Sequence, residues 1–204
     1  PWRANALDIS WEKYFGTKAY VSAAAYYKDL TSYIYTQSRT YDFTALNSTV
    51  TQPPLPRVAQ GQFTAPYNGQ GGRVSGVELA ASLPLGMLTP SLTGFGVILN
   101  ASFNDSSVKI KDPESSSSVG DGFITLPGLS KYVYNLTAYY ERGGFEARIS
   151  QRRRGDFIGE IGNFAGARTL RYVVGENITD AQVSYNFNTG TLKGLSLLLQ
   201  VNNL

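Results

Sequence analysis

The stretch VVGENITDAQVSYNF, residues 173–187, decides the fold class because its apolar and polar side chains alternate. Successive side chains of a β-strand point to opposite faces. One face of this segment would carry its mostly apolar members, Thr179, Ala181, Val183, Tyr185 and Phe187. The other would carry its mostly polar members, Ile178, Asp180, Gln182, Ser184 and Asn186. This pattern predicts a strand with one face away from water.

The same alternation recurs along the chain. It predicts eight strands, at residues 4–14, 19–36, 73–83, 94–108, 129–141, 145–158, 173–187 and 195–204. In an up-and-down meander the longer connections, 37–72, 109–126 and 159–170, would all fall at one end. The shorter ones, 15–18, 84–93, 142–144 and 188–194, would fall at the other. Long loops at one end and tight turns at the other are typical of outer-membrane barrels, whose apolar face meets lipid and whose polar face lines the lumen.

Aromatic side chains support a membrane barrel. Trp11, Tyr14, Phe15, Tyr20, Tyr139, Tyr140, Phe145, Tyr185 and Phe187 lie near the short turns, where an interfacial belt is expected. The facing of residues 19–36 is ambiguous in the sequence. We expect Val21, Ala23, Ala25 and Tyr27 to face outward, and Ser22, Ala24, Tyr26 and Lys28 inward.

Composition excludes several classes of activity. The 204 residues include no Cys and no His, so a disulfide framework, a thiolate metal site and a Ser-His-Asp triad are impossible. Charged residues make up 16% of the chain and the net charge is +3, which is low for a nucleic-acid-binding protein. We therefore expect no catalytic residue, no cofactor, no metal site and no nucleic-acid partner.

Three segments carry a family resemblance: AYYKDLTSYI at 25–34, NGQGGRVSGVELAASLPL at 68–85 and LPGLSKYVYNLTAYYERGGFEARIS at 126–150. The second is built around Gly76-Val77-Glu78, and the third holds Ser130, Asn135, Tyr140 and Arg148. In this order they resemble the barrel of TonB-dependent outer-membrane receptors.

The resemblance implies an all-β, antiparallel meander of about eight strands within a 22-stranded transmembrane β-barrel. Residues 1–204 would be part of that barrel, with the plug domain and the remaining strands absent from them. The whole receptor would import a siderophore, cobalamin or oligosaccharide across the bacterial outer membrane. Its partners would be outer-membrane lipid, its own N-terminal plug, the TonB complex acting through that plug, and the small-molecule nutrient.

Two sets of residues are candidates for function. The long connections supply aromatic and basic candidates for substrate binding, Tyr35, Arg39, Tyr41, Phe63, Tyr67, Phe123, Phe164 and Arg168. The strands supply candidates that face the lumen, Glu78, Glu146, Arg148, Arg152 and Arg154. We expect the carboxylates of Asp8, Glu12, Glu78, Glu141 and Glu146 to be matched by Lys28, Arg148 and Arg152.

Alternation places Arg153 outward, near the loop end of its strand, where it could reach headgroup phosphates.

Two other kinds of protein fit the same pattern: a different outer-membrane barrel, such as a passive porin or an adhesin, and a soluble carbohydrate-binding β-sandwich. The stripe of Leu195, Leu197, Leu199 and Val201 distinguishes the sandwich. A sandwich would bury this stripe against a second sheet, whereas a barrel would present it to lipid.

Overall fold

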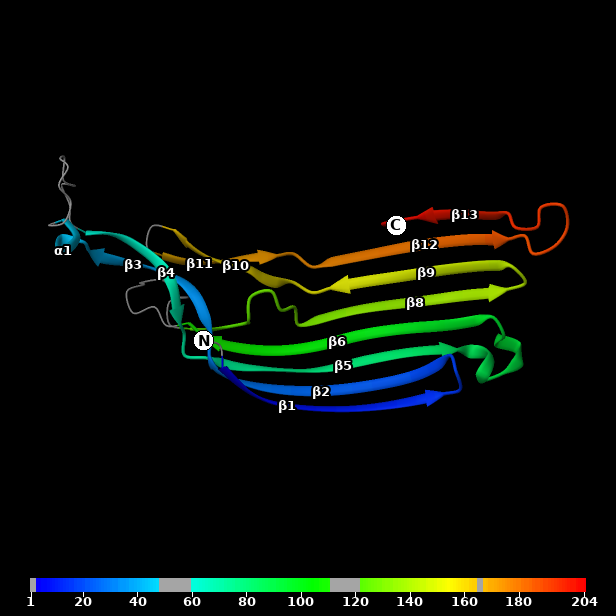
Figure 1. Cartoon of the computed structure of the whole chain (residues 1–204), viewed down its shortest axis with the longest axis horizontal. Coiled ribbons are helices and arrows are strands. Elements are labelled where there is room, and N and C mark those ends of the chain that lie inside the picture. Colours follow the sequence, from blue (N-terminus) through cyan, green and yellow to red (C-terminus); the bar gives the residue numbers. More distant parts are fainter. Residues whose placement is uncertain (1–2, 48–59, 111–121, 165–166) are drawn as a thin grey trace.

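The computed structural model describes residues 3–47, 60–110, 122–164 and 167–204. Its main element is one antiparallel sheet in which consecutive strands of the meander are neighbours (Figure 1). In order across the sheet, the strands are β1 (Arg3–Phe15), β2 (Ala19–Ser32), β5 (Gly72–Pro84), β6 (Phe95–Lys109), β8 (Tyr132–Arg142), β9 (Phe145–Arg154), β12 (Glu176–Asn186) and β13 (Ser196–Val201). The short strand β7 (Phe123–Ile124) pairs with the end of β6. The predicted eight-strand meander is confirmed.

The long connections contain strands of their own, which the sequence analysis missed. Residues predicted as the loop 37–72 include most of the hairpin of β3 (Ile34–Asp42) and β4 (Gln60–Asn68), with helix α1 (Thr44–Asn47) after β3. Residues 159–164 and 167–170 of the predicted loop 159–170 lie in the hairpin of β10 (Phe157–Phe164) and β11 (Ala167–Val173). The strands predicted at 19–36 and 145–158 were therefore too long, because each one breaks where a hairpin leaves the sheet.

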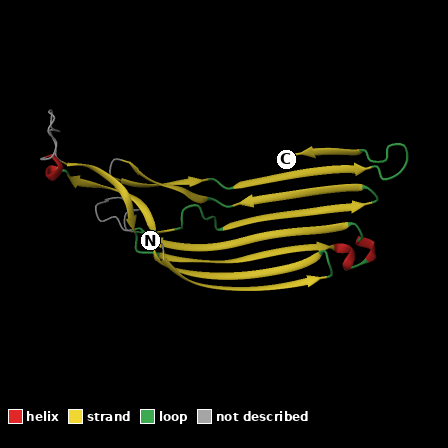
Figure 2. Ribbon diagram, viewed as in Figure 1, coloured by secondary structure: helices red, strands yellow, loops and turns green. Residues whose placement is uncertain are grey.

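The connections are nevertheless sorted between the two ends as predicted (Figures 1 and 2). Both hairpins extend from one end, which we call the loop end. Tight turns occupy the opposite end of the sheet, which we call the turn end. The short 3₁₀ helices η1 (Leu85–Met87) and η2 (Pro90–Leu92) also lie there. The turn between β8 and β9 uses Gly143 and Gly144 at φ of 60° and 88°, a region that glycine enters without steric cost.

The register between neighbouring strands places the apolar side chains of all eight strands on the same face of the sheet. Leu99 of β6, for example, pairs with Ala81 on one side and Leu136 on the other. The result is a continuous apolar face, which includes Leu7, Ile9, Trp11, Val21, Ala23, Ala25, Tyr27, Val77, Leu79, Ala81, Val97, Leu99, Ala101, Phe103, Tyr132, Tyr134, Leu136, Ala138, Tyr140, Phe145, Ala147, Ile149, Ala181, Val183, Tyr185, Leu197, Leu199 and Val201. The predicted facing of residues 21–28 agrees with this register.

The opposite, polar face carries the charged and small side chains of the same strands. It includes Asp8, Ser10, Glu12, Ser22, Ala24, Tyr26, Lys28, Glu78, Ala80, Asn100, Ser102, Asn104, Asn135, Thr137, Tyr139, Glu141, Glu146, Arg148, Ser150, Arg152, Arg154, Asp180, Gln182, Ser184 and Leu198.

The apolar face is exposed along its length. Leu7, Leu197 and Leu199 are each more than half exposed, and no second sheet in the described part of the chain covers them. This contradicts the β-sandwich alternative, which requires the stripe around Leu197 to be buried. Among the described residues, no helix has the length and apolarity needed to cross a membrane.

Two adjacent leucines of β13 test which face meets lipid. Leu199 lies on the apolar face opposite Val183, and Leu198 lies on the polar face opposite Ser184. We expect Leu199→Arg to destabilise the full-length barrel by about 2–4 kcal/mol, the usual cost of a cation at mid-membrane on a lipid-exposed face. Leu198→Arg should cost much less, since it faces away from lipid. Urea unfolding in lipid vesicles measures both, and equal losses would contradict the assignment of the faces.

Candidate functional site

A groove of about 400 Å³ lies on the sheet across β1, β2, β5, β6 and β8. Small side chains on neighbouring strands, such as Ser22, Ala24 and Ala80, leave the space open. Glu12 and Glu78 contribute carboxylates to its lining. Glu12 accepts a hydrogen bond of 2.7 Å from the hydroxyl of Tyr14. The groove is therefore a concavity of mixed polar and apolar lining that includes two acidic side chains.

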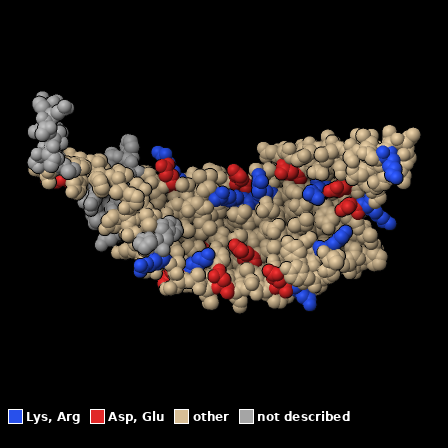
Figure 3. Space-filling model, viewed as in Figure 1, with Lys and Arg blue, Asp and Glu red and all other residues tan. Residues whose placement is uncertain are grey.

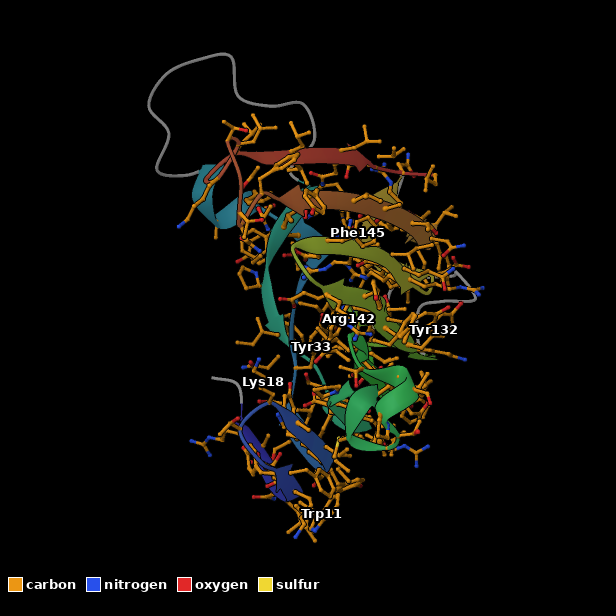
Figure 4. All side chains as sticks on the ribbon, turned by 90° about the vertical axis from the view of Figure 1, so that its right-hand side faces the viewer. Trp11, Lys18, Tyr33, Tyr132, Arg142 and Phe145 are labelled. Atoms are coloured by element: carbon orange, nitrogen blue, oxygen red, sulfur yellow. The ribbon has the colours of Figure 1, made fainter. Side chains whose placement is uncertain are left out.

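Charged side chains of both signs are spread across the molecule (Figure 3). On the polar face, Asp8, Glu12 and Glu78 lie on β1 and β5, whereas the arginines lie on β9 with Glu146. Seen end-on, the strands follow an arc, and the labelled Trp11 projects away from its interior (Figure 4). The strand order places β2, β5, β6 and β8 between β1 and β9. This spacing prevents the acidic groups of β1 from pairing with the arginines of β9.

Of the predicted charge matches on the polar face, the pairing of Glu146 with Arg148 is confirmed. Among the described residues, Arg148 pairs with Glu146 of its own strand at 3.3 Å. Lys28 instead lies over the ring of Tyr26, 5.2 Å from its centroid. Arg152 is exposed and, within the described chain, has no hydrogen bond or ion pair. Arg152 thus presents a cation on the polar face.

Arg154, another predicted lumenal cation, makes hydrogen bonds to the segment that precedes β8. Its Nε donates to Ser130 Oγ at 2.8 Å, and a terminal nitrogen donates to the carbonyl of Gly128 at 2.9 Å. Its guanidinium also lies 3.8 Å from the ring centroid of Phe157. Arg154 therefore positions the segment around residues 128–130 and joins the sheet to the β10–β11 hairpin.

The Gly-Val-Glu core of the second resemblance segment has a steric explanation. A Cβ at Gly76 would lie 2.7 Å from both Tyr26 Oη and Asn104 Oδ1. Those two atoms are hydrogen-bonded to each other at 2.7 Å, with the tyrosine donating. Asn104 in turn donates to the carbonyl of Ser130 at 3.2 Å. Glycine at this position makes room for a polar network that connects β2, β6 and the segment that precedes β8.

A small hydrophobic cluster holds the loop-end segments together. Tyr33, Tyr35 and Ile110 are buried there, and the partly buried Ile124, Leu126 and Ile161 pack against them. The rings of Tyr33 and Tyr35 are stacked, with centroids 6.4 Å apart. Burial raises the pKa of the Tyr33 phenol above its ordinary value, because desolvation disfavours the phenolate. Segments far apart in sequence thus share one core outside the main sheet.

Two predicted substrate residues belong to this cluster or its border. Tyr35 is only 5% exposed, so its ring is enclosed by protein and not presented to a ligand. Tyr67 packs edge-on against Tyr35, with ring centroids 6.3 Å apart, and remains half exposed.

A second aromatic group lies farther along the β3–β4 hairpin. Tyr41 and Phe63 are partly exposed, with ring centroids 5.7 Å apart, and Phe43 packs edge-on against Tyr41 at 4.9 Å. The adjacent Asp42 accepts hydrogen bonds from the backbone N–H and the hydroxyl of Thr44, which lower the pKa of its carboxyl. These residues form an aromatic surface on the hairpin.

The exposed Phe123 borders a pocket of about 370 Å³ between β7 and the β10–β11 hairpin. Ile158, Leu170 and Tyr172 also line it. Lys109 Nζ lies 5.8 Å from the centroid of the Phe123 ring. Tyr172 was not predicted from the sequence, because residues 171–172 were not recognised as part of a loop-end hairpin. Phe123 and Tyr172 are both more than 60% exposed and offer two aromatic surfaces beside an apolar floor.

Three further predicted substrate residues lie in the hairpin strands. In the backbone register, Arg39 pairs with Phe63, Arg168 pairs with Asn163, and Phe164 pairs with Ala167. The side chains of Arg39, Phe164 and Arg168 lie outside what the structure describes. In the described part of the chain, no three His, Cys, Asp or Glu side chains are grouped to hold a metal ion.

Comparison with known proteins connects this architecture to a family. A family model described as "TonB dependent receptor-like, beta-barrel" matches residues 1–204. Among solved structures, the chain resembles the ferric citrate transporter FecA in its unliganded form, with a TM-score of 0.58 and 16% sequence identity. The match covers 98% of this chain and 26% of the FecA chain. A comparison with curated protein sequences found no match.

The raised pKa of Tyr33 predicts a loss of loop-end stability at alkaline pH. A phenol whose pKa is higher in the folded state stabilises that state fully below its unfolded pKa of about 10. That stabilisation should fall as the pH rises above about 10 and through the folded pKa. Limited proteolysis of the β3–β4 hairpin between pH 8 and 12, corrected with an unstructured peptide, measures it. Tyr33→Phe should weaken the pH dependence, and an identical profile would contradict the explanation.

Proposed function

We propose, from the premise that the chain belongs to the TonB-dependent receptor β-barrel family, that it forms part of a receptor importing a scarce or bulky nutrient. The family consists of outer-membrane transporters and not of enzymes. The observation that carries the proposal is the family match along all 204 residues, together with a sheet of matching architecture.

The transport activity belongs to a larger protein. The chain spans about a quarter of the length of FecA. We therefore propose that residues 1–204 function with further barrel strands, an N-terminal plug and the TonB complex that acts through the plug. FecA is named as a ferric citrate transporter, but at 16% identity the likeness shows the fold alone. We assign the substrate no more narrowly than a small-molecule nutrient of the siderophore, cobalamin or oligosaccharide class.

The polar face is the proposed lumen wall, and the exposed apolar face is its lipid-facing side. Glu78, Glu146, Arg148, Arg152 and Arg154 all lie on the polar face, which supports this proposal. Their roles differ, because Arg148 is paired and Arg154 holds the segment near Ser130. Arg152 is the cation best placed to meet the plug or an anionic group of a passing substrate.

The first contact with substrate is proposed at the loop end. The pocket beside Phe123 and Tyr172 combines aromatic surfaces with an apolar floor, a setting suited to ring-containing ligands such as sugars and siderophores. Tyr41, Phe63 and Tyr67 supply exposed aromatic surface on the neighbouring hairpin. Arg39, Phe164 and Arg168 remain predicted contacts on the same end of the molecule.

Uptake measurements test the proposed function. The full-length receptor should be expressed in strains that lack their own outer-membrane receptors, with and without a working TonB complex, and supplied with labelled members of the three nutrient classes. Accumulation of one class that requires both receptor and TonB is the expected result. Receptor-dependent accumulation that persists without TonB would indicate a passive pore and overturn active import. No receptor-dependent uptake of any class would contradict the proposed range of substrates.

Removal of both rings at the loop-end pocket tests the site of capture. We expect Phe123→Ala with Tyr172→Ala to weaken binding of the imported nutrient about tenfold, since aromatic anchors contribute most of the energy in such pockets. Phe123→Tyr with Tyr172→Phe retains both rings and should bind nearly as wild type. Equilibrium binding to the purified receptor measures the difference. Unchanged affinity in the ring-less variant would place capture elsewhere.

A further inference from the structure

Arg153 is a cation on the apolar face of the sheet. It pairs in register with Tyr134 on one side and Asn177 on the other, and Tyr134 continues the same row to Ala101. A cation on a lipid-facing surface is strongly destabilising at mid-membrane but costs little near the interface. The depth of Arg153 therefore decides what surrounds it.

The tilt of the strands can be read from the apolar-face cations at the turn end. The row of Lys13 on β1 reaches Leu136 on β8. The corresponding cation of β8 is Arg142, which lies six residues nearer the turn than Leu136. Six residues extend about 20 Å along a strand, while four spacings between strands amount to about 19 Å. If both cations mark one interface, the strands tilt by about 45°, as in membrane barrels.

A second pair of cations marks the loop-end boundary. Since the turn-side boundary shifts six residues over four strand spacings, it lies about three residues beyond Ala81 on β5, and Arg73 lies about 11 residues from it. Tyr134, which pairs with Arg153, lies eight residues from Arg142 on β8, and one further spacing places Arg153 itself about 9.5 residues from the boundary. At this tilt the two distances span heights of about 26 Å and about 22 Å, close to the apolar band of about 25 Å in a membrane barrel. Arg73 and Arg153 therefore lie at nearly the same level, near the interface on the loop side.

The surroundings of Arg153 hold its guanidinium in place. Its Cζ lies 5.6 Å from the centroid of the Tyr132 ring, and Tyr134 is its register partner on β8. Next to it, Gln151 Nε2 donates to Asn177 Oδ1 at 3.2 Å, which leaves the amide nitrogen of Asn177 as a further donor. The site thus contains a fixed cation, two tyrosines and neutral hydrogen-bond donors.

Arg153 differs from Arg73 in its counter-charge. Arg73 lies 3.8 Å from Asp105, whereas Arg153 has no carboxylate partner among the described residues. Beside Arg153, the strand neighbours on the apolar face are the tyrosines, Gln151 and Asn177, none of them acidic. An anion from outside the described chain can complete this site.

We propose that Arg153, with Tyr132 and Tyr134, binds a phosphate group of an outer-leaflet lipid headgroup. Guanidinium groups bind phosphate through charge-assisted, paired hydrogen bonds. The site lies at the boundary of a lipid-facing surface, where headgroup phosphates are concentrated, and it faces away from the polar face that a soluble nutrient would follow. This inference rests on the outer-membrane location and not on the identity of the transported nutrient.

Lipid binding to the purified full-length receptor tests the site. The receptor, stripped of lipid in a zwitterionic detergent, is titrated with bis-phosphorylated lipid A and with the same lipid after removal of both phosphates, and bound lipid is counted by native mass spectrometry. Wild type should bind the phosphorylated lipid more tightly. Arg153→Gln should weaken that binding about fivefold, the usual contribution of one cation at an anionic surface.

Arg73→Gln is the matched control, because it removes the same charge at nearly the same level from a residue that already has a carboxylate partner. It should change lipid binding by less than twofold. Equal losses of lipid binding in both variants would mean that the lipid responds to general electrostatic attraction, and would contradict a specific site at Arg153. Equal binding of both lipids by wild type would also overturn it, and this comparison does not depend on any variant folding. Heat-dependent gel mobility confirms that each variant barrel is folded.

Discussion

Unbroken register between neighbouring strands is the constraint on which the rest of this structure depends. Because side chains alternate with a period of two, a slip of one residue between strands would move every apolar side chain of a strand to the polar face. A single row such as Ala81, Leu99 and Leu136 shows that no such slip occurs across the centre of the sheet. Lipid strengthens this constraint, since backbone groups in hydrocarbon must all find partners within the protein.

The same constraint explains the close approach of side chains at glycines on the polar face. A strand cannot shift to relieve crowding without losing its register, so relief has to come from the side chains. Gly96 lies beneath the ring of Tyr139, where a Cβ would come within 2.1 Å of the ring. Gly76 similarly accommodates the hydrogen-bonded pair of Tyr26 and Asn104. Glycine removes a side chain where a neighbouring strand supplies a large one, and the ladder remains intact.

The strands of the main sheet could be predicted from sequence because lipid and lumen impose two different solvents on their two faces. In β6, Phe95, Val97 and Leu99 alternate with polar or small residues in the manner that this environment requires. The hairpin strands lack that environment. β3 reads IYTQSRTYD and β4 contains Pro66, so neither shows regular alternation. The burial of Tyr35 was equally hidden, since it depends on Ile110 and Tyr33 meeting across the fold.

The loop end therefore follows a different physical rule from the sheet. Its segments are held by a small hydrophobic cluster and by specific hydrogen bonds, above all those of Arg154 to Ser130 and Gly128. Arg154 is the last residue of β9, so it ties the cluster to the strand that also carries Arg152 and Arg153. Substitutions at the outer aromatic positions, such as Phe123, leave the strand register untouched. The residues that recognise a ligand at the loop end can therefore change without a change in the sheet, because backbone hydrogen bonds and lipid set its strand register.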